Sequence, residues 1–403
     1  MQRHIATRIV LIWLAWAVIL IGYMQIASAR LAPNRPDDAL TWSATETTFR
    51  SNNDKPYLLE PFLNTQVAWD SEFYLGIATA GYDNPDIRLV ESGGEAYSMS
   101  YAFFPLYPFI MQVVRAPFEL FGMGSIAAST LAGVLVSLLG TLAAMFALYD
   151  IVRDELGEAG GLRTVFLMLV FPTSVFFVAV YTEGLFVGLA FGSLALMRRQ
   201  QFVAAGLLAA AATWTRAIGG VLVAPLLLTW GMAYYRQIED RRALLWRLPA
   251  LVAPVVAYGL WRLAYGQQFD FVEEHWFGNQ LLDLETTRDA WRQILERARA
   301  VPETAIVVAL GVSGIALALI SCVVCLWRYP ALALFGLIAL VVPLTGGWTG
   351  TQSAVRYILA VPTLWILLGR LSRDVVFDRA WTLLSVLLLA MQAFLFSYDF
   401  WVA

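Results

Sequence analysis

Long apolar segments alternate with short polar ones along most of the chain. Eleven of these segments are apolar enough to be interpreted as membrane spans, which need about 20 apolar residues each. The first lies between Arg8 and Arg30, where 21 residues carry no charge, more than the apolar core of a signal peptide needs. The pattern predicts an all-α polytopic membrane protein with one transmembrane domain over residues 1–403. The predicted spans are residues 9–29, 125–149, 164–181, 184–197, 202–216, 217–235, 248–265, 304–327, 330–346, 355–370 and 381–401.

A twelfth apolar segment, residues 103–121, decides which side of the membrane every later loop faces. If it does not cross, the short connections on the N-terminal side hold 14 arginines against eight acidic residues. If it crosses, the pairs Arg198–Arg199 and Arg241–Arg242 face away from the N-terminus. Because arginine is enriched in short cytoplasmic loops, we favour the first arrangement. We therefore expect eleven spans in the plasma membrane, a cytoplasmic N-terminus, and residues 103–121 as an interfacial or partly inserted element.

Two long polar segments, residues 30–102 and 266–303, then form extracytoplasmic loops. In the first loop, the residues after Asp70 place aromatic and aliphatic side chains on one helical stripe. This spacing predicts a short helix that lies on the bilayer surface and ends at Gly81. The second loop is predicted to hold another amphipathic helix near residues 287–299.

Composition supports a membrane protein and excludes several other classes. Hydrophobic residues make up 59% of the chain and charged residues 14%, far from the balance of a soluble domain. The sequence has no Walker or Rossmann glycine pattern, and no aspartate pair spaced to bind a nucleotide sugar through a metal. We expect no metal, no cofactor and no nucleic-acid partner. Cys322 and Cys325 lie in an apolar segment without a nearby histidine, so we interpret them as buried side chains.

The first candidate for chemistry is Asp70, in the sequence VAWDSEFYLGIATAGYDNP. Trp69 favours the membrane interface, so Asp70 would lie where both water and lipid headgroups reach it. A carboxylate at that position can accept a proton from the hydroxyl of an acceptor, as a general base. The alternative is that Asp70 caps the predicted helix, as aspartate commonly does.

Two arginines interrupt apolar sequence on the same predicted side of the membrane. Arg216 lies in AATWTRAIGG, and Arg356 lies in SAVRYILAV beside Tyr357. A charge within a membrane span is costly and usually marks a functional site. Because a planar guanidinium suits a phosphate group, we expect both arginines to bind one. The alternative is that both side chains extend outward to water along their apolar stems.

Two other polar residues stand out. Glu183 is the only charge in the 34 residues from Thr164 to Met197. A single helix of that length would overrun the bilayer, so a tight turn around residues 182–184 is predicted. Glu183 then either takes part in the site or faces water at that turn. His275, in EEHWFGNQ, is one of two histidines and offers no metal cluster of its own.

All five candidates fall on the predicted extracytoplasmic side, where nucleotide sugars and ATP are scarce. An activated substrate there is more plausibly carried on a lipid phosphate. In order along the chain, the blocks WDSEFYLGIATAGY, YAFFPLYP, FPTSVFFVAVYTEGLF, ATWTRAIGG, HW and SAVRY span roughly residues 67–360. In sequence and order these blocks resemble the PIG-V mannosyltransferase family, whose members are multi-pass glycosyltransferases of the GT-C fold.

This resemblance implies a transfer reaction and a site. The implied donor is polyprenyl-phosphate mannose, the acceptor is a lipid-linked glycan or glycolipid, and transfer inverts the sugar. Asp70 matches the catalytic acid of the first outer loop, with Arg216 and Arg356 at the donor phosphate. The alternatives are a GT-C enzyme that uses another polyprenyl-phosphate sugar, and a transporter that flips a lipid or sugar. The residues expected to contact substrate are Trp69, Tyr107, Glu183, His275 and Tyr357.

Overall fold

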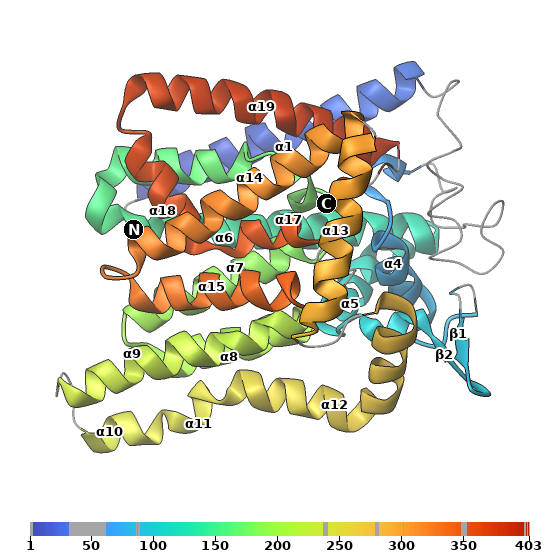
Figure 1. The fold of residues 1–403 in the computed structure, drawn as a ribbon, viewed down its shortest axis with the longest axis horizontal. Coiled ribbons are helices and arrows are strands. Elements are labelled where there is room, and N and C mark those ends of the chain that lie inside the picture. Colours follow the sequence, from blue (N-terminus) through green and yellow to red (C-terminus); the bar gives the residue numbers. More distant parts are fainter. Residues whose placement is uncertain are drawn as a thin grey trace.

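The computed structural model describes residues 3–31, 62–85, 87, 89–236, 241–278, 282–300, 302–347, 353–398, 400 and 402. Helices dominate, and the long ones run in a common direction (Figure 1). The predicted all-α membrane fold is confirmed. Its helices are α1 Arg3–Leu31, α4 Ser71–Ala80, α5 Leu106–Leu120, α6 Ser125–Leu169, α7 Glu183–Arg198, α8 Phe202–Thr215, α9 Val223–Tyr235, α10 Arg241–Trp246, α11 Leu248–Leu251, α12 Ala253–Val272, α13 Leu284–Ala300, α14 Pro302–Cys325, α15 Pro330–Leu344, α17 Ala354–Tyr357, α18 Pro362–Leu371 and α19 Val375–Ser397.

Several helices are long and apolar enough to cross a membrane. In the part of the chain that the structure describes there are five, namely α1, α6, α9 with the 3-10 turn before it, α14 and α19. The count rises to six if Ala354–Ala360 and α18, which meet at 73°, form one broken span. Helices α8 and α15 are apolar but shorter, with 14 and 15 residues. The chain is therefore a multi-pass membrane protein, and the predicted count of eleven spans is not confirmed.

Helix α6 is the centre of the bundle. The protein buries 67% of its most apolar stretch, against 28–33% in the other four candidate spans. The predicted span 164–181 is wrong as a continuous helix, because α6 ends at Leu169 and a 3-10 turn intervenes before α7 begins at Glu183. The physical reason is Pro172, which lacks an N–H group and disfavours a helical conformation of the residue before it.

Helices α6 and α7 approach closely because glycines line their contact. A Cβ atom at Gly184 would clash with the carbonyl oxygen of Ser137, and one at Gly188 would clash with that of Gly140. Small residues that let two backbones meet are typical of helix contacts in membranes. This contact fixes the start of α7, where Glu183 lies.

We expect Gly188→Ala to lower the free energy of unfolding by about 1–3 kcal/mol, the usual cost of overpacking a core. Thermal unfolding in detergent measures the effect. Gly22→Ala on α1 is the matched control, since nothing lies within 4 Å of the added methyl group. Equal shifts of the unfolding temperature in the two variants would show that the α6–α7 contact tolerates a side chain.

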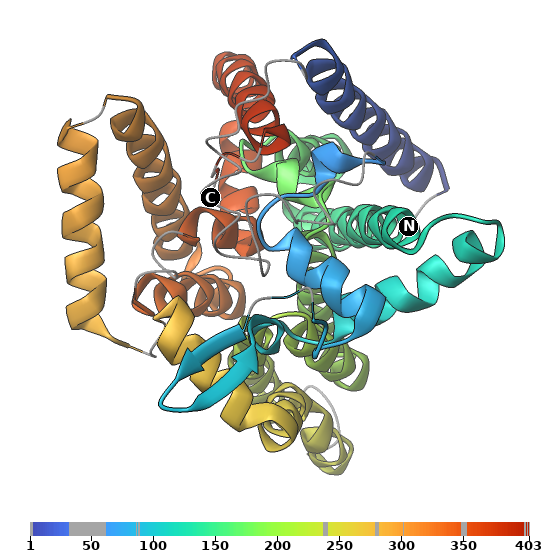
Figure 2. The ribbon, with the colours of Figure 1, turned by 90° about the vertical axis from the view of Figure 1, so that its right-hand side faces the viewer.

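Several shorter elements gather at one end of the bundle. Helix α13 lies across the long helices at the right of Figure 1, and Figure 2 shows this end face-on with α4 near its centre. Helix α13 confirms the helix predicted near residues 287–299. The antiparallel hairpin of β1 Leu89–Ser92 and β2 Glu95–Ser98 was not predicted from the sequence. Its turn uses Gly93 and Gly94, whose φ angles of 61° and 88° suit a two-residue hairpin connection.

Helix α4 confirms the helix predicted after Asp70 and its end at Gly81, where φ is 87°. Its predicted position on the bilayer surface is wrong, because every residue from Ser71 to Ala78 is buried in the protein. Phe73 stacks on Phe103 on one side, with ring centroids 4.4 Å apart. On another side the small Gly76 lets Ile87 pack against the helix backbone. The stripe that suggested contact with lipid therefore packs inside the protein.

The opposite end of the bundle gathers arginines from the short connections. Glu155 of α6 forms ion pairs with Arg370 at 2.6 Å and with Arg328 at 3.0 Å. Trp246, the last residue of α10, and Trp327, two residues after α14, are 85% and 94% exposed there. Clustered arginines and exposed tryptophans are typical of a membrane–water interface. The prediction that this end faces the cytoplasm stays a prediction.

The two cysteines are buried free thiols, as predicted. Cys322 lies 3.2 Å from the Thr363 hydroxyl, in the contact between α14 and α18. They therefore serve as packing residues of the bundle.

Candidate active site

Four charged residues from distant parts of the chain meet at the end of the bundle that carries α4. Asp70 immediately precedes α4, and Glu183 is the first residue of α7. Arg216 directly follows α8, and Arg356 lies in α17. The structure thus brings together the candidate acid, both candidate phosphate-binding arginines and Glu183. We call these four residues the charged cluster.

The charged cluster forms a chain of alternating charges. Nη1 of Arg356 donates to Oδ2 of Asp70 at 2.5 Å and lies 3.9 Å from Oε1 of Glu183. Nη1 of Arg216 donates to the same Oε1 atom of Glu183. It also donates to the Thr182 hydroxyl at 3.3 Å. Two carboxylates and two guanidiniums give the cluster no net charge, which is what allows it to be buried.

Burial decides between the alternatives that the sequence left open. The exposed fraction of the side chain is 6% for Arg356, 14% for Arg216 and 3% for Glu183. The interpretation that both arginines extend outward to water is therefore wrong, and so is the interpretation that Glu183 only faces water. Asp70, with 21% of its side chain exposed, is the most accessible member of the cluster.

Aromatic rings support both guanidiniums. The guanidinium carbon of Arg216 lies 4.7 Å from the ring centre of Tyr357. That of Arg356 lies 5.4 Å from the ring centre of Tyr181 and 5.6 Å from that of Phe176. Cation–π contacts of this kind stabilise a desolvated positive charge and limit its movement. Tyr357 is therefore beside the cluster, and its contact with substrate stays a prediction.

The backbone around Trp69 turns Asp70 into the cluster. Trp69 has a φ of 54°, a left-handed conformation that costs a bulky residue of order 1–3 kcal/mol. The backbone N–H of Asp70 donates to the Tyr181 hydroxyl at 3.2 Å. In the same contact, the N–H of Val180, the residue before Tyr181, donates to the carbonyl of Gln66 at 2.9 Å.

The side chain of Asp70 makes no capping hydrogen bond to α4. The capping interpretation is therefore wrong for the carboxylate, although Asp70 does stand at the start of the helix. Its carboxylate accepts a hydrogen bond from Nη1 of Arg356 instead.

Three other predicted substrate residues differ from one another in their surroundings. Trp69 is only 4% exposed and belongs to the core. Tyr107 is fully buried, and its hydroxyl donates to the carbonyl of Gly133 at 3.0 Å. His275 is exposed and stacks on Phe271, with ring centroids 4.4 Å apart. Within the described ranges, no hydrogen bond, ion pair or ring contact joins His275 to the charged cluster.

Four polar residues beside the charged cluster were not predicted from the sequence, namely Tyr74, Tyr181, Thr182 and Ser353. The Tyr74 hydroxyl lies 3.5 Å from that of Thr182, and the Ser353 hydroxyl accepts from Nη2 of Arg356 at 2.9 Å. Burial, reinforced by the negative charge of Asp70, raises the pKa of Tyr74 above its ordinary value, so its phenol stays neutral. A usable signal was sequence proximity. Each of these residues lies within one helical turn of a member of the charged cluster.

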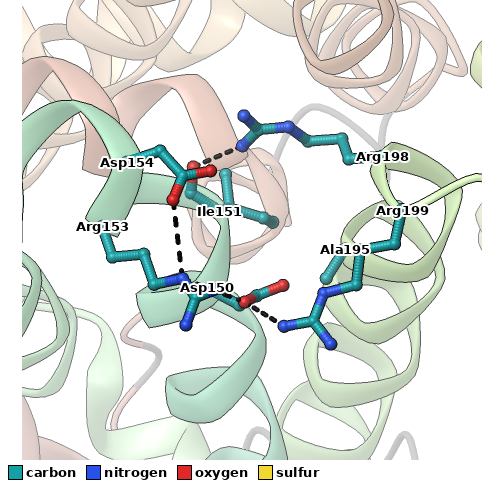
Figure 3. Close-up of a pocket in the computed structure, with 7 residues that line it drawn as sticks. All are labelled: Asp150, Ile151, Arg153, Asp154, Ala195, Arg198 and Arg199. Atoms are coloured by element: carbon teal, nitrogen blue, oxygen red, sulfur yellow. Dashed lines mark hydrogen bonds and ion pairs between the residues drawn. The ribbon is translucent and has the colours of Figure 1, made fainter. Parts of the chain in front are cut away.

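A second charged pocket lies at the other end of α7 (Figure 3). Arg199 forms an ion pair with Asp150, and Arg153 lies 3.4 Å from Asp150 and 3.6 Å from Asp154. Helix α7 has 16 residues, so about 24 Å separates this pocket from the charged cluster. The pair of Arg199 and Asp150 joins the end of α7 to α6, whereas Arg153 pairs within α6, and no candidate from the sequence lies among these residues. Over the described residues, no three His, Cys, Asp or Glu side chains are grouped to hold a metal ion.

Comparisons with known proteins give one family and several similar folds. A family model described as Mannosyltransferase (PIG-V) matches residues 20–271. ArnT from Cupriavidus metallidurans, solved with bound undecaprenyl phosphate, is 15% identical with a TM-score of 0.45, covering 96% of this chain and 76% of its own. The oligosaccharyltransferase AglB from Archaeoglobus fulgidus, solved with an inhibitory peptide and a dolichol-phosphate, is 14% identical with a TM-score of 0.45, covering 94% of this chain and 56% of its own. A search of curated proteins gave no match.

Proposed function

Because the chain belongs to the PIG-V mannosyltransferase family, and so is a membrane glycosyltransferase, we propose that it transfers mannose from polyprenyl-phosphate mannose to a lipid-linked or glycolipid acceptor. Transfer takes place on the extracytoplasmic side of the plasma membrane, at the charged cluster. The observation that carries this assignment is the meeting of one accessible carboxylate, Asp70, with two buried guanidiniums. A sugar carried on a lipid phosphate needs both kinds of group.

Asp70 acts as the general base. It takes the proton of the acceptor hydroxyl, while the acceptor oxygen forms a bond to C1 of mannose. The bond from C1 to the phosphate oxygen breaks, and its electron pair leaves on the polyprenyl phosphate. Attack opposite the leaving group inverts C1. The exposure of Asp70, higher than that of Glu183, supports this choice between the two acids.

Arg216 and Arg356 bind the donor phosphate and stabilise the negative charge that grows on it as the C1–O bond breaks. Their burial supports this role, because a preoriented donor acts more strongly where water is excluded. Glu183 remains the counter-ion of Arg216 and keeps the two guanidiniums near each other. Tyr357 holds Arg216 in place.

Incubating the purified protein with radiolabelled polyprenyl-phosphate mannose and a membrane lipid extract tests the proposal. We expect label to appear covalently on an acceptor, with one polyprenyl phosphate released for each mannose transferred. Liposomes without protein are the control. Label that crosses a liposome membrane without covalent transfer would identify a flippase instead. Faster transfer from polyprenyl-phosphate glucose or arabinose would identify a different sugar donor.

A further inference from the structure

The ion pair between Asp70 and Arg356 joins two groups that the proposed function needs to act separately. Oδ2 of Asp70 lies 2.5 Å from Nη1 of Arg356. While this charge-assisted hydrogen bond is in place, the guanidinium occupies the carboxylate oxygen that would take the proton of the acceptor. The same hydrogen bond occupies the donor group with which Arg356 would bind a phosphate. Both groups are therefore occupied by each other, and the ion pair must open before either can act in the proposed transfer.

The two carboxylates of the cluster differ in how easily each can break its ion pair and turn toward solvent. Glu183 is 3% exposed, and its Oε1 atom is held by Arg216. Asp70 is 21% exposed and lies at the start of a helix without capping it, so a change of rotamer can turn its carboxylate toward solvent. An anion that reaches Arg356 therefore displaces Asp70 and leaves Glu183 in place. When Asp70 turns away, the incoming anion takes its place as the counter-ion of the buried Arg356 guanidinium.

We propose that the donor phosphate and the Asp70 carboxylate compete for the guanidinium of Arg356, so that donor binding releases the base. This inference rests on the proposed function and adds an order to it. The lipid-linked donor binds first, and only then is Asp70 free to take the proton of the acceptor. Asp70 thus occupies the position of the donor phosphate in the resting protein.

The affinity for undecaprenyl phosphate, measured with the full chain in lipid nanodiscs, tests this competition. We expect Asp70→Asn to bind the lipid at least about tenfold more tightly than the wild type, because its competitor for Arg356 carries no charge. Asp154→Asn is the matched control, since it makes the same change of charge at the far end of the bundle, where Asp154 is 74% exposed. It should keep wild-type affinity.

A second measurement uses the unmodified protein, so it does not depend on the folding of a variant. A water-soluble carbodiimide with an amine labels accessible carboxyl groups, and peptide mass spectrometry locates the label. We expect labelling of Asp70 to rise several-fold when undecaprenyl phosphate is added, while that of Asp154 stays constant. Unchanged or reduced labelling of Asp70, or unchanged or weaker binding by Asp70→Asn, would overturn the competition in a protein that still transfers mannose. A wild-type protein that neither binds undecaprenyl phosphate nor transfers mannose would overturn the proposed function itself.

Discussion

Replacing Asp70 by asparagine is expected to lower the rate of mannose transfer about 10²–10⁴-fold, the usual contribution of a general base. The amide keeps the shape of the side chain and can still accept a hydrogen bond from Arg356, but it cannot take a proton. The backbone hydrogen bond from residue 70 to the Tyr181 hydroxyl does not depend on the side chain. We therefore expect a folded protein that is inserted in the membrane and inactive.

Initial rates with radiolabelled donor at several donor concentrations separate chemistry from binding. Loss of the general base is expected to lower kcat. Loss of the carboxylate that competes with the donor phosphate for Arg356 is not expected to raise the KM for the donor. Asp154→Asn, in the second charged pocket, controls for the change of net charge and should keep wild-type kinetics. A rate for Asp70→Asn close to that of the wild type would show that Asp70 is not the general base.

Glu183, Arg216 and Arg356 could be found from the sequence because each is a charge in or beside apolar sequence, where it is costly and therefore rarely accidental. Asp70 could be found because it follows Trp69, a residue that favours the membrane interface. Their pairing could not be found. Asp70 and Arg356 are 286 residues apart, and no sequence pattern near either residue indicates that the two form a pair. Whether each arginine reached water or an acid depended on the packing of helices α7, α8 and α17, which no local pattern specifies.

In the fold, too, the ends of helices were predictable from local sequence, whereas their burial depended on tertiary packing. Gly81 and the helix before it were predictable from periodicity and the conformational freedom of glycine. The depth of α4 was not, because an apolar stripe fits a lipid surface and a protein interior equally well. Pro172 was a usable signal for the break after α6. The adjacent Gly93 and Gly94, between short polar–apolar runs, were a similar signal for the hairpin.

Replacing Arg356 by glutamine is expected to lower turnover about 10²–10³-fold, the effect of removing one oriented donor to a developing anion. The fold should survive, because Glu183 keeps Arg216 as its partner and Asp70 can turn toward water. Arg356→Lys should recover only a small part of the loss. The native side chain donates to Asp70 through Nη1 and to Ser353 through Nη2, and a lysine offers one point charge in place of that fork.

The kinetic pattern distinguishes this role from a purely structural one. If Arg356 binds the donor phosphate and stabilises it as it leaves, both kcat and the affinity for undecaprenyl phosphate fall, while the unfolding temperature changes little. Arg199→Gln is the matched control, because Arg199 also pairs with an aspartate but lies 50% exposed at the other end of α7. A variant Arg356→Gln that is as active as Arg199→Gln would show that the leaving phosphate is stabilised elsewhere. Loss of kcat with unchanged lipid affinity would confine Arg356 to the bond-breaking step, since it would then bind the phosphate only as charge develops on it.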